Sequence, residues 1–204
     1  LTGRSLKTDY NSLLVAPVNM FEKFINMILN ERNNARDGKP SQIIAKFNNM
    51  EENEITACLY EASQAGVPIS LLIRGFTGVK AQQPTLSQNI RVISVIGRFL
   101  EHSRIFYFRN GHEDPLDGNF FLGSADWMYR NLHARVEAIV PIYDRDLKKR
   151  LWDLLAKMTD DHRQTWDMNA NGEYHQRTGA GPGVQEELIG WHRSEERRVG
   201  KECL

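Results

Sequence analysis

Short apolar runs alternate with amphipathic segments in the N-terminal part of the chain. Residues 13–17 are apolar and close on a proline, which is typical of a buried strand, and the runs at 42–47 and 68–73 predict two more strands. Apolar residues recur at helical spacing within 21–29 and again within 55–62. Because strands and helices alternate, we expect a parallel sheet with helices packed on it.

The helix boundaries follow from capping residues. Asn19 precedes the first amphipathic segment and Glu22 follows three residues later, which predicts a capping box. The Asp-Gly-Lys-Pro sequence at 37–40 is a stop signal for this helix. Asp144 predicts the N-cap of a later helix, whose apolar face is formed by the leucines within 147–155.

The second half of the chain adds more strands. Apolar or alternating runs at 90–96, 104–108, 120–122 and 136–142 predict four of them. With the elements before them, they predict an α/β fold with a mostly parallel mixed sheet and helices on both faces.

We expect three parts along the chain. Residues 1–160 form one domain, and 161–192 form a polar C-terminal extension, folded as a small hairpin or an extended tail. Residues 193–204 resemble a translated sequencing adapter, with a charged, solvated tail as the alternative, and are left out of the fold prediction. Because the chain begins with Leu1, we also expect that its natural start is missing.

Composition excludes several classes of protein. The 204 residues are 41% hydrophobic and 25% charged, as in soluble globular domains. The 26 basic and 26 acidic residues cancel, which argues against a nucleic-acid partner or an anionic membrane surface. No apolar run reaches the roughly 20 residues of a membrane-spanning helix. Cys58 and Cys203 lack the spacing of a zinc site or redox pair, which favours a reducing compartment.

The sequence His102-Ser103-Arg104 is the sharpest chemical feature. Residues two apart on a strand face the same side, so an imidazole and a guanidinium would enter one pocket. Histidine exchanges protons near neutral pH, and arginine grips phosphate oxygens through its planar fork. The pair suits phosphoryl chemistry, while a partly buried, hydrogen-bonded structural histidine is the alternative.

Further polar residues lie at the ends of the predicted strands. Gly123-Ser124-Ala125-Asp126 forms a small-residue turn whose backbone N–H groups and Ser124 hydroxyl could meet an anion, or whose side chains could simply cap the turn. Arg74 ends a predicted parallel strand, where open α/β sheets bind ligands, with a surface ion pair as its alternative. Lys46 and Asn48 alternate at another strand end and are candidate phosphate contacts or a solvated terminus.

Longer stretches then follow one another in a specific order. These are Leu-Val-Ala-Pro at 14–17, Lys-Phe-Asn at 46–48, Leu-Tyr-Glu-Ala-Ser-Gln-Ala-Gly-Val at 59–67, Ile-Arg-Gly at 73–75, Gly-Arg-Phe-Leu-Glu-His-Ser-Arg-Ile at 97–105, Gly-Ser-Ala-Asp-Trp-Met at 123–128 and Arg-Asn-Leu at 130–132. Together they resemble the C-terminal part of the long bacterial polyphosphate kinases over roughly residues 1–178.

The resemblance implies a phospholipase-D-like fold and a kinase that reversibly moves the terminal phosphate of ATP onto polyphosphate. The family uses two phospholipase-D-like domains, of which the first carries a histidine that becomes phosphorylated. It assigns the second active-site histidine to His102 and a nucleotide-phosphate contact to Arg74. Arg104, Lys46, Asn48 and Ser124 are further candidate phosphate ligands.

The resemblance also implies the surroundings of the reaction. Mg²⁺ is the expected cofactor. Its ligands and the phosphorylated histidine are both expected to lie outside this chain. ATP or ADP and polyphosphate are the expected partners, in a homo-oligomer when full length. The expected location is the cytoplasm, and peripheral attachment to the inner membrane is an alternative. The chain alone is expected to be inactive.

Two alternatives stay open on the sequence. The first is a phosphodiesterase of the phospholipase-D type, which predicts a lysine where Arg104 stands and a second histidine motif. The second is a non-catalytic half that binds phosphate or a partner subunit.

Overall fold

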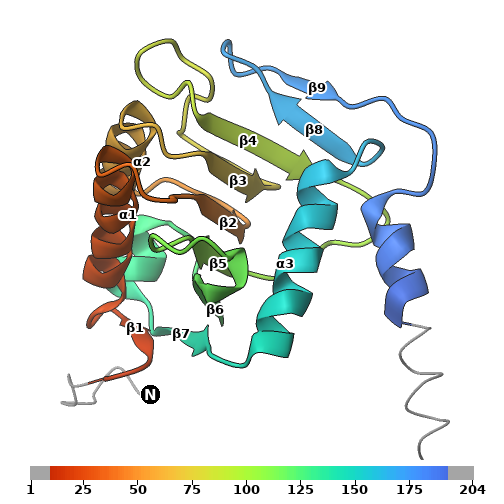
Figure 1. Cartoon of the computed structure of the whole chain (residues 1–204). Coiled ribbons are helices and arrows are strands. Elements are labelled where there is room, and N and C mark those ends of the chain that lie inside the picture. The colour runs from red at the N-terminus through yellow and green to blue at the C-terminus, as the bar shows by residue number, and fades with distance from the viewer. Residues whose placement is uncertain (1–9, 193–204) are drawn as a thin grey trace, which may run out of the picture.

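The computed structural model describes residues 10–192, which fold around one mixed sheet (Figure 1). Nine strands are paired in the order β1-β7-β6-β5-β2-β3-β4-β8-β9. The strands are β1 (Leu14–Ala16), β2 (Ile43–Phe47), β3 (Ile69–Ile73), β4 (Ile90–Val95), β5 (Ile105–Phe108), β6 (Asn119–Gly123), β7 (Glu137–Ile142), β8 (Thr165–Met168) and β9 (Tyr174–Gln176).

Helices cover both faces of the sheet, which confirms the predicted α/β class. Figure 1 shows α1 (Met20–Arg36) and α2 (Asn53–Gln64) on one face and α3 (Arg145–Asp160) on the other. A 3₁₀ turn η1 (Pro115–Asp117) and a single π-helical turn η2 (Arg130–Ala134) lie in connections. Each face has its own buried apolar cluster, the larger beneath α1 and α2. None of the helices in the described part of the chain could cross a membrane.

The expectation of a mostly parallel sheet is wrong. Only β2–β3 and β3–β4 are parallel among the described strand pairs, and the others are antiparallel. The crossover through α2 makes β3 parallel to β2, but the connections around β6 contain no long helix and return the chain antiparallel. The first strand does not join β2; it pairs with β7 at the sheet edge.

An aromatic cluster fills the space between the sheet and α1. The ring of Trp127 lies 5.4 Å from Phe24, 5.0 Å from Phe47 and 5.4 Å from Phe106, and the indole is fully buried. Trp127 directly follows Asp126, so this packing fixes the position of Asp126 just after β6. The residue therefore belongs to the core and presents no surface for a nucleotide base.

The two predicted helix caps have different outcomes. Asp144 caps α3, because its carboxylate accepts a hydrogen bond from the Leu147 N–H at 2.9 Å. The capping box at α1 is wrong: Asn19 makes no side-chain cap and instead accepts from the Val15 N–H at 2.7 Å. This bond holds the turn between β1 and α1. In α3, Leu155 is buried as expected, whereas Leu147 is 49% exposed.

The segment 161–192, expected to form a hairpin or a tail, contains a hairpin that extends the sheet, followed by a helix over 184–192 that was not predicted. Strands β8 and β9 pair with each other, and β8 pairs with β4. Arg177 braces it, donating to the Asp167 carboxylate and to the carbonyls of Thr159 and Asp161. The predicted adapter-like segment at 193–204 lies outside the described residues.

A buried carboxylate ties α1 to two loops. Glu31 is fully buried and accepts hydrogen bonds from the backbone N–H groups of Gln42, at 3.0 Å, and Asn110. Burial raises the pKa of Glu31 to about 7, although both backbone donors and Arg109 act in the opposite direction.

We predict that Glu31 makes folding stability depend on pH. The raised pKa means that the folded state favours the protonated acid, so its contribution to stability is fully present below about pH 4.5 and is lost as the pH rises through about 7. Urea unfolding of the wild type and Glu31→Gln across this range should show the wild type losing up to about 3 kcal/mol relative to the variant. Parallel pH profiles for the two proteins would contradict this role.

Candidate functional site

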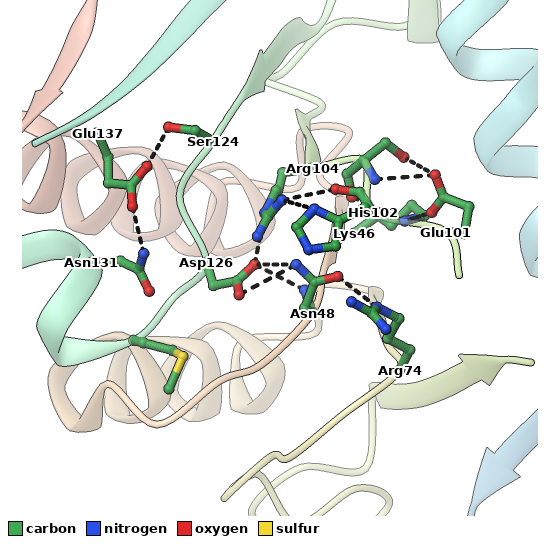
Figure 2. A network of polar contacts seen from close by, with 12 residues as sticks. Lys46, Asn48, Arg74, Glu101, His102, Arg104, Ser124, Asp126, Asn131 and Glu137 are labelled. Carbon is green, nitrogen blue, oxygen red and sulfur yellow. Dashed lines mark hydrogen bonds and ion pairs between the residues drawn. The ribbon is translucent and has the colours of Figure 1, made fainter. Parts of the chain in front are cut away.

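Four chain segments meet at one end of the central strands. Residues Phe47 and Ile73, the last of β2 and β3, are partners in the parallel register. Strand β5 runs antiparallel to β2 and β6, and its first residue, Ile105, pairs with Lys46 of β2 and Leu122 of β6. The start of β5 and the end of β6 therefore lie at the same edge. Side chains just beyond these positions, although far apart in sequence, therefore lie close together (Figure 2).

The carboxylate of Asp126 is the centre of this cluster. It is buried and accepts hydrogen bonds at 2.9 Å from both the Asn48 backbone N–H and the Arg104 Nε. The Asn48 side-chain amide donates to its two oxygens at 3.1 and 3.4 Å. One carboxylate thus joins the end of β2 to the segment that precedes β5.

Arg104 and His102 lie against each other, as the sequence predicted, but for a different reason. Both residues precede β5, so the contact does not come from the alternation of a strand. The Arg104 Nη1 lies 2.6 Å from Nδ1 of His102 and donates to the His102 carbonyl at 2.9 Å. The imidazole is exposed, which contradicts the alternative of a partly buried structural histidine.

Arg74 is held at the opposite side of the cluster by a neutral partner. Its Nε donates to Asn48 Oδ1 at 2.7 Å, which connects it through Asp126 to Arg104 and His102. Arg74 forms no ion pair with any residue in 10–192, and its two terminal nitrogens make no hydrogen bond there. The surface ion pair that was its alternative is absent in this part of the chain, and the charge of the half-buried guanidinium remains uncompensated.

Lys46 is neutralised by Glu101, the residue next to His102. Its ammonium group pairs with this carboxylate and donates to the Ser103 carbonyl at 3.0 Å. Burial lowers the pKa of Lys46, and Glu101 offsets part of this effect. Burial raises the pKa of Glu101, but the donors of Lys46 and Ser103 outweigh it and hold this pKa below its ordinary value. Lys46 is thus occupied in holding the His102 loop.

The C-terminal segment braces the same loop. The Gln185 side chain accepts from the Phe99 N–H at 2.7 Å and donates to the Phe99 carbonyl at 2.9 Å. A small cavity of about 20 Å³ lies between Gln185, Lys46, Arg74 and Glu101. It has room for about one water molecule and is too small to hold a larger ligand.

Ser124 takes part in a separate group of contacts. Its hydroxyl donates to the Glu137 carboxylate, which also accepts from Asn131 at 2.7 Å (Figure 2). The Ser124 backbone N–H donates to the Ala138 carbonyl at 3.1 Å. The hydroxyl and this N–H are therefore engaged with β7, and the contacts of Ser124 do not bring it to Arg74 or His102.

Sequence reasoning missed three contributors to the cluster. The sequence places Asp126 in a possible anion-binding turn, with turn capping as the alternative, and it does not single out Glu101 or Gln185. Glu101 could have been found, because it directly precedes His102 in a motif already noted. Nothing in the sequence indicates that Gln185 reaches a loop 86 positions earlier.

The acidic side chains of the cluster are occupied by basic partners. Glu101 pairs with Lys46 and Asp126 with Arg104. Within the described residues, no group of three or more histidine, cysteine, aspartate or glutamate side chains could hold a metal ion. The residues present here therefore do not fit a magnesium ion by themselves.

Comparisons with known proteins identify the family of this chain. The family model described as "Polyphosphate kinase C-terminal domain 2" matches residues 13–186. The polyphosphate kinase of Synechocystis sp. is 49% identical over 182 residues, which cover 89% of this chain and 24% of the relative. That of Dictyostelium discoideum is 40% identical over 178 residues, covering 87% and 16%. The chain spans about a quarter of the length of the first curated relatives it matches.

Solved structures give the same result. The structure of polyphosphate kinase from Porphyromonas gingivalis matches with a TM-score of 0.87 and 31% identity, covering 95% of this chain and 30% of that chain. The phospholipase D family member Nuc from Salmonella typhimurium matches with a TM-score of 0.52 and 12% identity, covering 80% and 96%, which shows a likeness of fold alone. The resemblance found in the sequence is confirmed, and the chain belongs to the polyphosphate kinase family through its C-terminal domain 2.

Proposed function

We propose that this chain supplies one half of the site at which a polyphosphate kinase moves the terminal phosphate of ATP to inorganic polyphosphate and back. The observation that carries the proposal is the uncompensated guanidinium of Arg74, linked through Asn48, Asp126 and Arg104 to the exposed imidazole of His102. A cation with two free donors beside an accessible imidazole is suited to a polyphosphate anion.

Arg74 provides the main electrostatic contribution in this proposal. Its Nε is occupied by Asn48, so Nη1 and Nη2 remain as a pair of parallel donors for two phosphate oxygens. Negative charge spread over a phosphoryl group in transfer is stabilised by such preorganised donors. Because Asn48 holds the guanidinium in place, little reorganisation is needed when the anion arrives.

The other candidate phosphate contacts act mainly by placing Arg74 and His102. Lys46 and Asn48 were candidate phosphate contacts, but Lys46 is paired with Glu101 and Asn48 with Asp126 and Arg74. These contacts support a role in holding the His102 loop and Arg74. Ser124, bonded to Glu137, is the least supported of the candidate phosphate ligands.

The remaining parts of the reaction are proposed to come from elsewhere in the relatives. The resemblance assigns the phosphorylated histidine and the ligands of Mg²⁺ to regions that this chain does not span. We therefore propose that the 204-residue chain alone binds phosphate groups without completing the transfer. A homo-oligomeric enzyme and a cytoplasmic location remain predictions from the resemblance.

A phosphodiesterase is less well supported. That alternative predicts a lysine at position 104, whereas the chain has an arginine there. The likeness to Nuc concerns only the fold, while the relatives that are 49% identical are named polyphosphate kinases.

The proposal is tested in a chimera in which residues 13–186 replace the matched segment of the Synechocystis polyphosphate kinase. Incubated with ATP labelled at its terminal phosphate, the chimera should form long acid-precipitable polymer. A chimera that melts and elutes like its parent but makes no polymer would refute the proposed function. Release of alcohol from a phosphate diester would favour the phosphodiesterase.

We predict that His102→Ala in this chimera lowers polymer synthesis by about 100-fold or more. The variant removes a group placed against the reacting phosphate, and losses of this size are typical for such donors or acids. His112→Ala is the matched control, because His112 is exposed on the turn after β5 and should leave the rate unchanged. Polymer synthesis near the chimera's own level in His102→Ala would exclude the role.

We predict that Arg74→Lys weakens catalysis although it keeps the charge. A lysine cannot bond Asn48 and also present two parallel donors, so the specificity constant for ATP should fall about 10- to 100-fold. Arg145→Lys, at an ion pair with Asp114 and Asp117 near the start of α3, is the control that should have little effect. Equal kinetics for Arg74→Lys and the control would contradict the assignment.

A further inference from the structure

The contact between Arg104 and His102 determines which imidazole nitrogen can carry the proton. A guanidinium has only N–H donors and no acceptor, whereas each imidazole nitrogen either donates or accepts. The Arg104 Nη1 lies 2.6 Å from Nδ1 of His102, so Nδ1 must offer its lone pair. In the neutral ring, the hydrogen therefore resides on Nε2.

We propose that Arg104 is a positioning residue that holds His102 as the neutral tautomer protonated on Nε2, so that His102 donates a hydrogen bond to a phosphate oxygen. This inference rests on the proposed function for the identity of the anion. The tautomer itself follows from the contact with Arg104. Nε2 has no hydrogen-bond partner among residues 10–192 and is available to an incoming group.

The tautomer restricts the chemistry of His102. A nitrogen that carries a hydrogen has no lone pair to attack phosphorus, and the lone pair of Nδ1 is occupied by Arg104. His102 therefore does not accept the phosphoryl group while this contact is made. An imidazolium would carry a hydrogen on Nδ1 as well, and this hydrogen would point at the N–H of the Arg104 guanidinium. The ring therefore acts as a neutral hydrogen-bond donor through Nε2. Its N–H bond stays intact in this role.

The surroundings of Arg104 prevent it from releasing the ring easily. Its Nε is bonded at 2.9 Å to Asp126, and its Nη1 also donates to the His102 carbonyl. The side chains of Arg104 and Asp126 are only 14% and 7% exposed. Lysine would replace this planar group by a single ammonium, which cannot bond Asp126 and the imidazole in the same geometry.

Chemical reactivity tests the occupied lone pair without any substrate. Diethyl pyrocarbonate acylates neutral imidazoles at the nitrogen with a free lone pair. In the 204-residue chain at neutral pH, His102 should react about tenfold more slowly than His112, although both are exposed. Arg104→Met should bring the His102 rate to within about twofold of His112. Arg98→Met, on the same exposed loop, is the matched control and should leave His102 protected.

Either of two results would overturn the assignment. In the wild type, His102 could react as fast as His112, or Arg104→Met could leave its rate unchanged. A second measurement needs no variant: long-range ¹H–¹⁵N correlation spectra of the histidine-labelled chain at alkaline pH. We expect the pattern of an Nε2–H ring for His102, and an Nδ1–H pattern would refute the proposal.

A double-mutant cycle in the chimera tests the consequence for catalysis. Arg104→Met should lower polymer synthesis about tenfold when His102 is present and less than about twofold in the His102→Ala background, because it acts through the imidazole. The same loss in both backgrounds would mean that Arg104 contacts phosphate directly and would contradict its positioning role. A folded chimera that makes no polymer would refute the proposed function, while the reactivity and spectra still decide the tautomer.

Discussion

The arrangement of the whole cluster depends on the buried carboxylate of Asp126. It accepts hydrogen bonds from the Asn48 backbone and side chain and from the Arg104 guanidinium, all at the end of the central strands. Removing one partner of a buried ion pair leaves the other charge without compensation, which is more costly than the loss of an exposed contact. Through this single group the positions of Arg74 and His102 become linked, although 28 positions separate them in sequence.

The distribution of charge then decides which groups remain for an anion. Two basic residues of the cluster are each paired with a carboxylate, Lys46 with Glu101 and Arg104 with Asp126. The side chains of both basic residues are largely buried. Among residues 10–192, Arg74 bonds only to the neutral amide of Asn48, so no carboxylate there compensates its charge. The fold thus uses internal ion pairs to fix the geometry and leaves one guanidinium and one imidazole open, which supports the proposed binding of a polyphosphate chain or a nucleotide.

Much of this structure could be predicted from local patterns. The apolar runs predicted β1 to β7, the helical spacing predicted α1 and α2, and the ordered motifs led to the family, whereas β8 and β9 lie in a segment expected to be a hairpin or a tail. Strand direction could not be predicted, because it depends on whether a connection crosses the sheet, and the segments around β6 do not. Likewise, Glu101, Asp126 and Gln185 act through partners distant in sequence, and such contacts leave no periodic signal.

The most direct test of this account is a crystal structure of the chimera with a non-hydrolysable ATP analogue. In that structure, the two terminal nitrogens of Arg74 and Nε2 of His102 should lie within hydrogen-bonding distance of phosphate oxygens, with Arg104 still bonded to Nδ1 and to Asp126. Phosphates bound away from Arg74, or a His102 ring turned so that Nδ1 faces the nucleotide, would contradict it.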